Sequence, residues 1–97
     1  MCDIKAYKRI TLRNTAFNRP TEDNPFQYVI GWNEGHENYG IDTYEKFETA
    51  RKDRNPINQK IIEVWGYKSE IIGRNIDKGY LKFKRIFIKS FNKIEIE

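Results

Sequence analysis

The chain has 97 residues, so residues 1–97 suffice for a single domain with one modest hydrophobic core and are too few for two. Charged residues make up 33% of the sequence and aromatic residues 14%, and this aromatic content argues against a disordered chain. The single cysteine, Cys2, excludes an internal disulfide bond and a metal cluster built on cysteines.

The sequence lacks the marks of an exported or membrane-inserted protein. No apolar run approaches the roughly 20 residues that a membrane-spanning helix needs. The first residues, Met1 to Lys5, contain neither an apolar block nor the small-residue cleavage site of a secretory signal. We therefore expect a cytoplasmic protein.

The formal net charge of +4 conceals a segregation of charge along the chain. Lys and Arg dominate residues 1–19 and 49–93, whereas acidic residues dominate 20–48 and the tail adds Glu95 and Glu97. Segregation of this kind favours an anionic partner for one face of the protein. The alternative is that the acidic middle segment packs beside the basic strands and neutralises them.

The first predicted strand runs from Asp3 to Arg13. Apolar positions alternate there with basic and polar ones, interrupted only by Lys8, which is typical of an amphipathic strand with a basic outer face. A loop rich in turn formers follows over Asn14–Pro25. Phe26–Trp32 is predicted as a second strand, whose alternate large side chains face the core: Phe26, Tyr28, Ile30 and Trp32.

A polar connection over Asn33–Gly40 leads to the only predicted helix, of about 13 residues. Asp42 is expected to cap this helix, and Glu45 completes a capping-box pattern three residues later. Asn55-Pro56 ends it, because proline cannot continue a helix. The apolar stripe that would face the sheet consists of Tyr44, Phe47 and Ala50.

Gln59–Tyr67, Ile71–Ile76 and Tyr80–Ile88 are predicted as three further strands, and the tail from Asn92 alternates like a short edge strand. The turn-forming sequence that ends at Gly79 predicts that the second and third of these strands form an antiparallel hairpin. Within the third, the apolar alternation changes phase at Arg85-Ile86. This indicates either a β-bulge or a strand with both faces partly covered.

Together these elements predict an α+β fold, a small, mostly antiparallel β-sheet with one helix on one face, in the order ββαβββ. Four large aromatic side chains are expected in its core: Trp32, Trp65, Phe83 and Phe87.

The sequence offers little for catalysis. His36 stands between Glu34 and Glu37, and a histidine beside carboxylates can act as a general base. A solvated polar loop explains the same residues. The sequence contains no second histidine for a metal site and no phosphate-cradling glycine loop. We therefore expect a protein that is not an enzyme and that binds neither a metal nor a cofactor.

The predicted strands favour a binding protein. If the first and fifth strands lie close in one sheet, their outer side chains form a cationic surface with aromatic platforms, which suits phosphates and unpaired bases. The basic end of the helix would extend this surface. The candidate residues for nucleic-acid or partner binding are Tyr7, Arg9, Arg13, Arg51, Lys52, Arg54, Tyr80, Lys82 and Lys84.

Two functions therefore stay open. In the first, a small non-enzymatic protein engages a nucleic acid or nucleoprotein complex through this basic, aromatic-bearing sheet face. In the second, an inhibitor of the phage or mobile-element type binds and blocks a host protein, as anti-CRISPR and anti-restriction proteins do. The aromatic residues of the chain suit a protein–protein interface, in which the loops Asn14–Pro25 and Asn33–Gly40 would contact the host protein.

Overall fold

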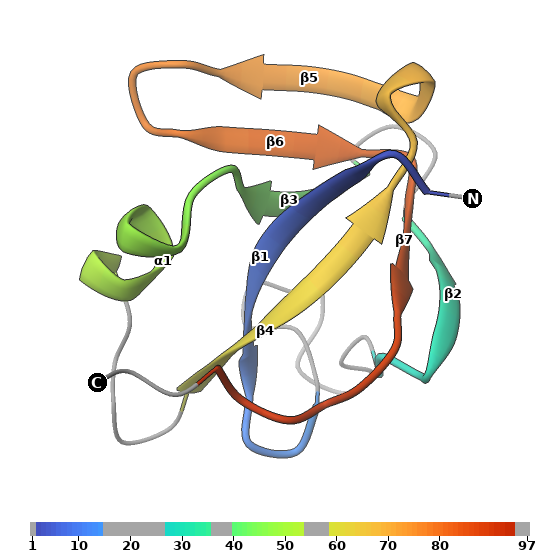
Figure 1. Ribbon diagram of the computed structural model, residues 1–97, viewed down its shortest axis with the longest axis vertical. Coiled ribbons are helices and arrows are strands. Elements are labelled where there is room, and N and C mark those ends of the chain that lie inside the picture. Colours follow the sequence, from blue (N-terminus) through green and yellow to red (C-terminus); the bar gives the residue numbers. More distant parts are fainter. Residues whose placement is uncertain (1, 15–26, 36–39, 54–58, 95–97) are drawn as a thin grey trace.

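The computed structural model describes residues 2–14, 27–35, 40–53 and 59–94. Within them, seven strands form one sheet and one α-helix packs against it (Figure 1). A short 3-10 turn, Lys68–Glu70, precedes β5. The elements are β1 (Ile4–Thr11), β2 (Gly31–Glu34), β3 (Ile41–Tyr44), α1 (Phe47–Asp53), β4 (Gln59–Gly66), β5 (Ile71–Asn75), β6 (Tyr80–Phe83) and β7 (Arg85–Ile88).

The sheet has the strand order β2-β7-β4-β1-β3-β6-β5, and its neighbouring strands pair antiparallel. A small antiparallel sheet with one helix is therefore confirmed. The element order differs from the expected ββαβββ, because the described chain has three strands before the helix and four after it. The central pair is β1 and β4, in register from Ile4 opposite Gly66 to Thr11 opposite Gln59.

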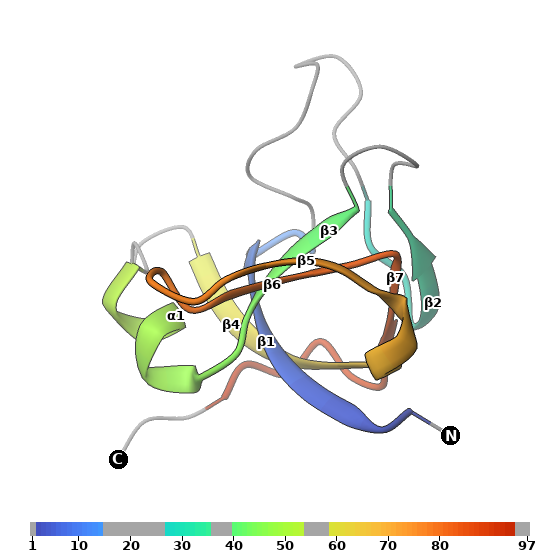
Figure 2. The ribbon, with the colours of Figure 1, turned by 90° about the horizontal axis from the view of Figure 1, so that it is seen from above.

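The main core lies on the concave side of the sheet. The sheet is strongly curved: β5 and β6 run across the top of Figure 1, beyond the ends of β1 and β4, whereas β2 and β7 form the other end of the strand order (Figures 1 and 2). Buried apolar side chains from both ends therefore meet without a helix between them. This inner cluster consists of Ala6, Ile10, Tyr28, Ile41, Ile62, Val64, Leu81, Phe83, Ile86 and Ile88.

The helix covers only part of the opposite, convex face. There Tyr7, Tyr44 and Tyr80 lie opposite one another on β1, β3 and β6. Phe47 of α1 meets the Tyr7 ring edge to face, with 5.8 Å between the ring centroids, and Ala50 is fully buried in the same cluster. Two members of the predicted apolar stripe, Phe47 and Ala50, therefore do pack on the sheet from the helix, whereas the third, Tyr44, belongs to β3. The helix closes the smaller of two apolar clusters.

The predicted start of the helix is wrong. Asp42 lies in β3, where it forms a 3.7 Å ion pair with Lys82, and the helix begins only at Phe47. The physical reason is that β3 fills the gap between β1 and β6, so its backbone hydrogen-bonds on both sides. Its alternation, with Thr43 facing inward and Tyr44 outward, suits that position.

The predicted second strand is displaced along the chain. β2 occupies Gly31–Glu34, while Tyr28 is the only described member of the expected Phe26–Trp32 face that reaches the core. Ile30 is 56% exposed, and Trp32 lies on the convex face. Phe26 lies outside the described residues. The buried amide of Asn33 explains the shift, because it hydrogen-bonds the backbone of Val29 and Gly31 and so holds those residues in a turn.

The hairpin and the change of phase are confirmed, but the prediction of Tyr80–Ile88 as one strand is wrong, because this segment divides into β6 and β7. β5 pairs with β6, and Gly79 adopts the left-handed conformation, with φ of 71°. The chain bends at Lys84 between β6 and β7, and β6 pairs with β3 and β5 whereas β7 pairs with β2 and β4. The bend keeps Leu81, Phe83, Ile86 and Ile88 all facing the inner cluster.

No strand forms over the described part of the tail. Residues 91–94 run beside β4, with the Ile94 N–H donating to the Ile61 carbonyl at 2.9 Å. The rest of the expected edge strand, residues 95–97, lies outside the described residues.

Lys8 interrupts the apolar side of β1 and points toward the concave side of the sheet. Its ammonium lies 5.9 Å from the centre of the Tyr28 ring. Burial lowers the pKa of Lys8 to about 8, with the nearby Arg9 acting in the same direction and Asp42 opposing them. The folded protein therefore carries a desolvated positive charge at neutral pH.

Gly66 is expected to tolerate no side chain. A Cβ there would lie 2.6 Å from the Phe83 ring, whereas a Cβ at Gly73 would meet only ordinary contacts of 3.6 Å or more. We predict that Gly66→Ala lowers the free energy of unfolding by about 1–3 kcal/mol through overpacking. Gly73→Ala, the matched control, changes it by less than about 1 kcal/mol. Urea denaturation measures both, and equal effects would contradict this packing.

Replacing Lys8 should change how stability depends on pH. Its pKa falls from the ordinary 10.5 to about 8 on folding, so between these values the unfolded chain binds a proton that the folded protein does not. Wild-type stability therefore gains from this group as the pH rises from 8 to 10.5. At pH 7 we predict that Lys8→Met is more stable than wild type by about 2 kcal/mol, discounted for partial exposure from about 1.4 kcal/mol per pKa unit. Denaturation curves at pH 7 and 10 test this, and a pH-independent difference between the two proteins would contradict it.

Candidate functional site

The part of the convex face that the helix leaves open carries a row of aromatic side chains. Phe87 of β7 lies opposite Trp32 of β2 on one side and Trp65 of β4 on the other. Lys5 of β1 lies opposite Trp65 and continues the row. We call Trp32, Phe87 and Trp65 the aromatic row. Because the register between strands aligns them, it is a property of the sheet and belongs to no single segment.

Local structure holds each ring in place. The Asn33 amide fixes the turn that precedes Trp32, and the bend at Lys84 turns Phe87 outward while its neighbours Ile86 and Ile88 are buried. The Trp32 and Phe87 rings meet edge to face, with 5.3 Å between centroids. Trp32 is 36% exposed and the other two are partly buried, so the row offers ring surface to a partner.

Arg85 forms the shortest ion pair among the described residues. Its guanidinium lies 4.1 Å from the centre of the Trp32 ring, and its Nε donates to both carboxylate oxygens of Glu70, at 2.9 and 3.2 Å. The hydrogen bond to Glu70 is the main cause that raises the pKa of Arg85. Tyr67 stacks on Trp32 with 5.7 Å between centroids. Arg85 and Tyr67 therefore hold Trp32 in a defined orientation.

Two lysines flank the other end of the row. The Lys89 ammonium lies 4.5 Å from the centre of the Trp65 ring, and that of Lys5 lies 5.8 Å away. Lys5 also pairs with the Glu63 carboxylate at 3.4 Å, and the Tyr7 hydroxyl and then Glu63 raise its pKa. Among the described carboxylates, none forms an ion pair with Lys89. Lys89 is thus a cation that an anionic partner can engage.

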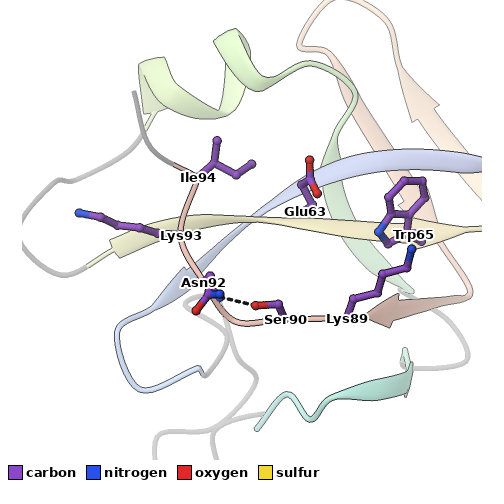
Figure 3. Close-up of a pocket in the computed structure, with 7 residues that line it drawn as sticks. All are labelled: Glu63, Trp65, Lys89, Ser90, Asn92, Lys93 and Ile94. Atoms are coloured by element: carbon purple, nitrogen blue, oxygen red, sulfur yellow. Dashed lines mark hydrogen bonds between the residues drawn. The ribbon is translucent and has the colours of Figure 1, made fainter. Parts of the chain in front are cut away.

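A pocket of about 290 Å³ adjoins the row at Trp65. Figure 3 shows it between β4 and the segment that follows β7, with Trp65 and Lys89 at one end and Ile94 and Lys93 at the other. The backbone N–H of Asn92 donates to the Ser90 hydroxyl at 3.0 Å and shapes the turn that forms one wall. The pocket combines an aromatic wall with hydrogen-bonding and cationic groups.

The structure places the sequence-predicted strand residues on the same convex face, under or near the helix. Tyr7 and Tyr80 belong to the helix-covered cluster, which leaves less ring surface for stacking. Arg9 lies 5.4 Å from the centre of the Tyr44 ring and donates to Gln59. Lys82 pairs with Asp42, and Lys84 is exposed at the bend.

The remaining candidates lie apart from these strands. Arg13 is exposed in the turn after β1, and Arg51 pairs with Glu48 on the helix at 3.7 Å. Lys52 borders a second hollow, of about 530 Å³, between α1 and the turn joining β5 to β6. Arg54 lies outside the described residues. The predicted set is therefore spread over several surfaces.

The expectation that Trp32, Trp65 and Phe87 lie in the core is wrong, and of the four aromatic residues only Phe83 is fully buried. One feature of the sequence indicates that Phe87 faces outward. Phe87 alternates in phase with Arg85 and Lys89, and out of phase with the buried Ile86 and Ile88. The side-by-side arrangement of the aromatic row had no such signal, because it depends on pairing between strands distant in the sequence.

The described residues do not test the one sequence pattern that was considered for catalysis. Glu34 is exposed at the end of β2, and His36 and Glu37 lie outside the described residues. Within the described ranges, no three His, Cys, Asp or Glu side chains gather as a metal site would require. The α-helix there is far too short and polar to cross a membrane.

Comparisons of this chain with protein-family models, curated proteins and solved structures find no match.

We predict that Arg85→Ala lowers the melting temperature clearly more than Arg74→Ala, the control. Arg85 is held by Trp32 and by two hydrogen bonds from its Nε, whereas Arg74 makes a half-exposed pair with Glu45 at 3.8 Å. The loss should also shift Trp32 fluorescence emission to longer wavelength. Thermal melts and emission spectra check both effects, and indistinguishable variants would count against an ordered Arg85.

Proposed function

We propose that this protein is a non-enzymatic binding protein that takes up single-stranded nucleic acid along the aromatic row. The observation that supports this most is the alignment of Trp32, Phe87 and Trp65 across three neighbouring strands, with Arg85 and Lys89 on the same face. Successive unpaired bases stack on such platforms while cations beside them meet the phosphates.

Stacking is the larger contribution in this proposal. Base stacking on an aromatic side chain contributes about 1–3 kcal/mol per base, regardless of base identity. The charges contribute less, because Glu70 holds Arg85 and Glu63 holds Lys5. Lys84, Lys89 and Lys93 form no ion pair with the described carboxylates, so they remain for phosphate contacts. Three such contacts give a logarithmic salt slope of about −2 for a single strand.

The proposal favours single strands over duplexes for a geometric reason. Bases inside a duplex are already stacked and paired, so their faces cannot reach rings on a sheet surface. The shared chemistry, an unpaired base with a phosphate beside it, occurs in both DNA and RNA.

The site also differs from the sequence-based expectation in position. The tyrosines of β1 and β6 lie largely beneath α1, whereas the rings of β2, β7 and β4 are not covered by the helix. The binding surface is therefore assigned to the opposite half of the same face. A protein target, the other function considered from the sequence, becomes an outcome of the experiment below.

Fluorescence anisotropy with labelled 12-nucleotide strands tests the proposal directly. We predict that wild-type protein binds single-stranded DNA or RNA and binds the matching duplexes more weakly. Trp32→Ala and Phe87→Ala should each weaken single-strand binding about 10-fold or more, because each removes a stacking platform. Lys89→Glu should weaken binding and flatten the salt slope by more than about 0.7, since it also adds a negative charge.

Matched controls lie on a different surface. Ile76→Ala removes an apolar side chain that is 81% exposed, and Lys78→Glu reverses a cation in the turn between β5 and β6. Both should bind like wild type. Absence of binding to every strand at low salt would overturn the proposal in favour of a protein partner, to be sought by affinity capture. Equal losses of affinity in the control variants and in the aromatic-row variants would contradict the assignment of the site to the aromatic row.

A further inference from the structure

The pocket beside Trp65 has the groups needed to select among bases. Its walls include the Trp65 ring and the aliphatic Ile94, which suit the face of a flat heterocycle. Glu63, Ser90 and Asn92 add polar atoms, and Lys89 and Lys93 stand at opposite ends (Figure 3). At about 290 Å³ the pocket is near the lower end of ligand sites, which run from roughly 300 to 1,000 Å³.

We propose that this pocket receives one unpaired base that carries an exocyclic amine, such as cytosine, and discriminates against uracil. This inference rests on the proposed function, since the aromatic row would deliver the strand to the pocket. It adds a preference that stacking alone does not produce, because every base has a π-face.

The carboxylate of Glu63 supplies the discrimination. An ionised carboxylate only accepts hydrogen bonds, and Lys5 contacts just one of its oxygens, Oε2. The amine of cytosine donates to such an oxygen, which is the standard pairing of Glu with that base. Uracil has a carbonyl oxygen at the same ring position. It would place one acceptor against another and leave the carboxylate without a donor from the ligand.

Asn92 and Ser90 complete the recognition. The backbone N–H of Asn92 is used within its own turn, which fixes the residue and leaves its side-chain amide as donor and acceptor for a base edge. The Ser90 oxygen accepts that N–H, and its hydroxyl hydrogen remains a donor. A base with one amine and one ring acceptor, as in cytosine, is complementary to this set.

Lys89 is also expected to move when the base binds. In the free protein its ammonium lies over the Trp65 ring, 4.5 Å from the centre. Its side chain is long, flexible and exposed, so it can turn toward a phosphate and release the indole face for the base. Binding should therefore change the fluorescence of Trp65. The variant Trp32→Phe leaves Trp65 as the one tryptophan in the sequence, so its signal can be followed alone.

The test compares two strands that differ only in the group at issue. Anisotropy titrations use 12-nucleotide deoxycytidine and deoxyuridine homopolymers, which share ring size and lack the thymine methyl group. We expect wild type to bind the cytosine strand more tightly than the uracil strand by about 10-fold or more, the effect of a hydrogen bond to a charged group. Glu63→Ala and Asn92→Ala should each reduce that ratio toward 1.

Controls and outcomes keep the two proposals separate. Glu48→Ala on the helix and Asn75→Ala on β5, both exposed and neither of them lining the pocket, should keep the wild-type ratio. Tight binding of both strands with no preference would overturn the pocket inference and leave the proposed function standing. A preference that survives both pocket variants would also overturn it. Binding of neither strand would overturn the proposed function itself.

Discussion

The arrangement of this protein depends on the bend at Lys84. Its backbone N–H donates to the Glu70 carbonyl at 2.8 Å, and its carbonyl accepts from the Gly35 N–H at 2.9 Å. The two bonds tie the bend to the start of β5 and the end of β2. β6 and β7 can therefore pair with different strands while the side chains of both reach one core. The curved sheet follows from this constraint.

The curvature of the sheet determines which part of its convex face the helix must cover. Because the concave cluster is closed by strands from both ends of the sheet, α1 is needed only over the tyrosines of β1, β3 and β6. The helix does not extend over the outward rings of β2, β7 and β4, which contact one another, Arg85 and Lys89 among the described residues. One half of this face is therefore packed against the helix, and the other half is the surface for which binding is proposed.

The cations of the open half are balanced by acids more closely than the net charge of +4 suggests. Arg85 is committed to Glu70, which favours an orienting role over long-range attraction. The proposed binding therefore relies more on ring surface and hydrogen bonding than on charge. The same conclusion applies to the pocket, where a carboxylate would be unfavourable for phosphate but suits the amine of a base.

Local pattern was enough to predict β1, β4, the hairpin closed by Gly79 and the change of phase near Arg85, because alternation and turn chemistry act between neighbouring residues. Two features depended on the tertiary structure. The local sequence predicts that the helix starts within residues 41–44. In the structure these residues form a strand, because β1 and β6 pair with them on both sides. The aromatic row exists only because the register of distant strands brings Trp32, Phe87 and Trp65 together, which no local pattern encodes.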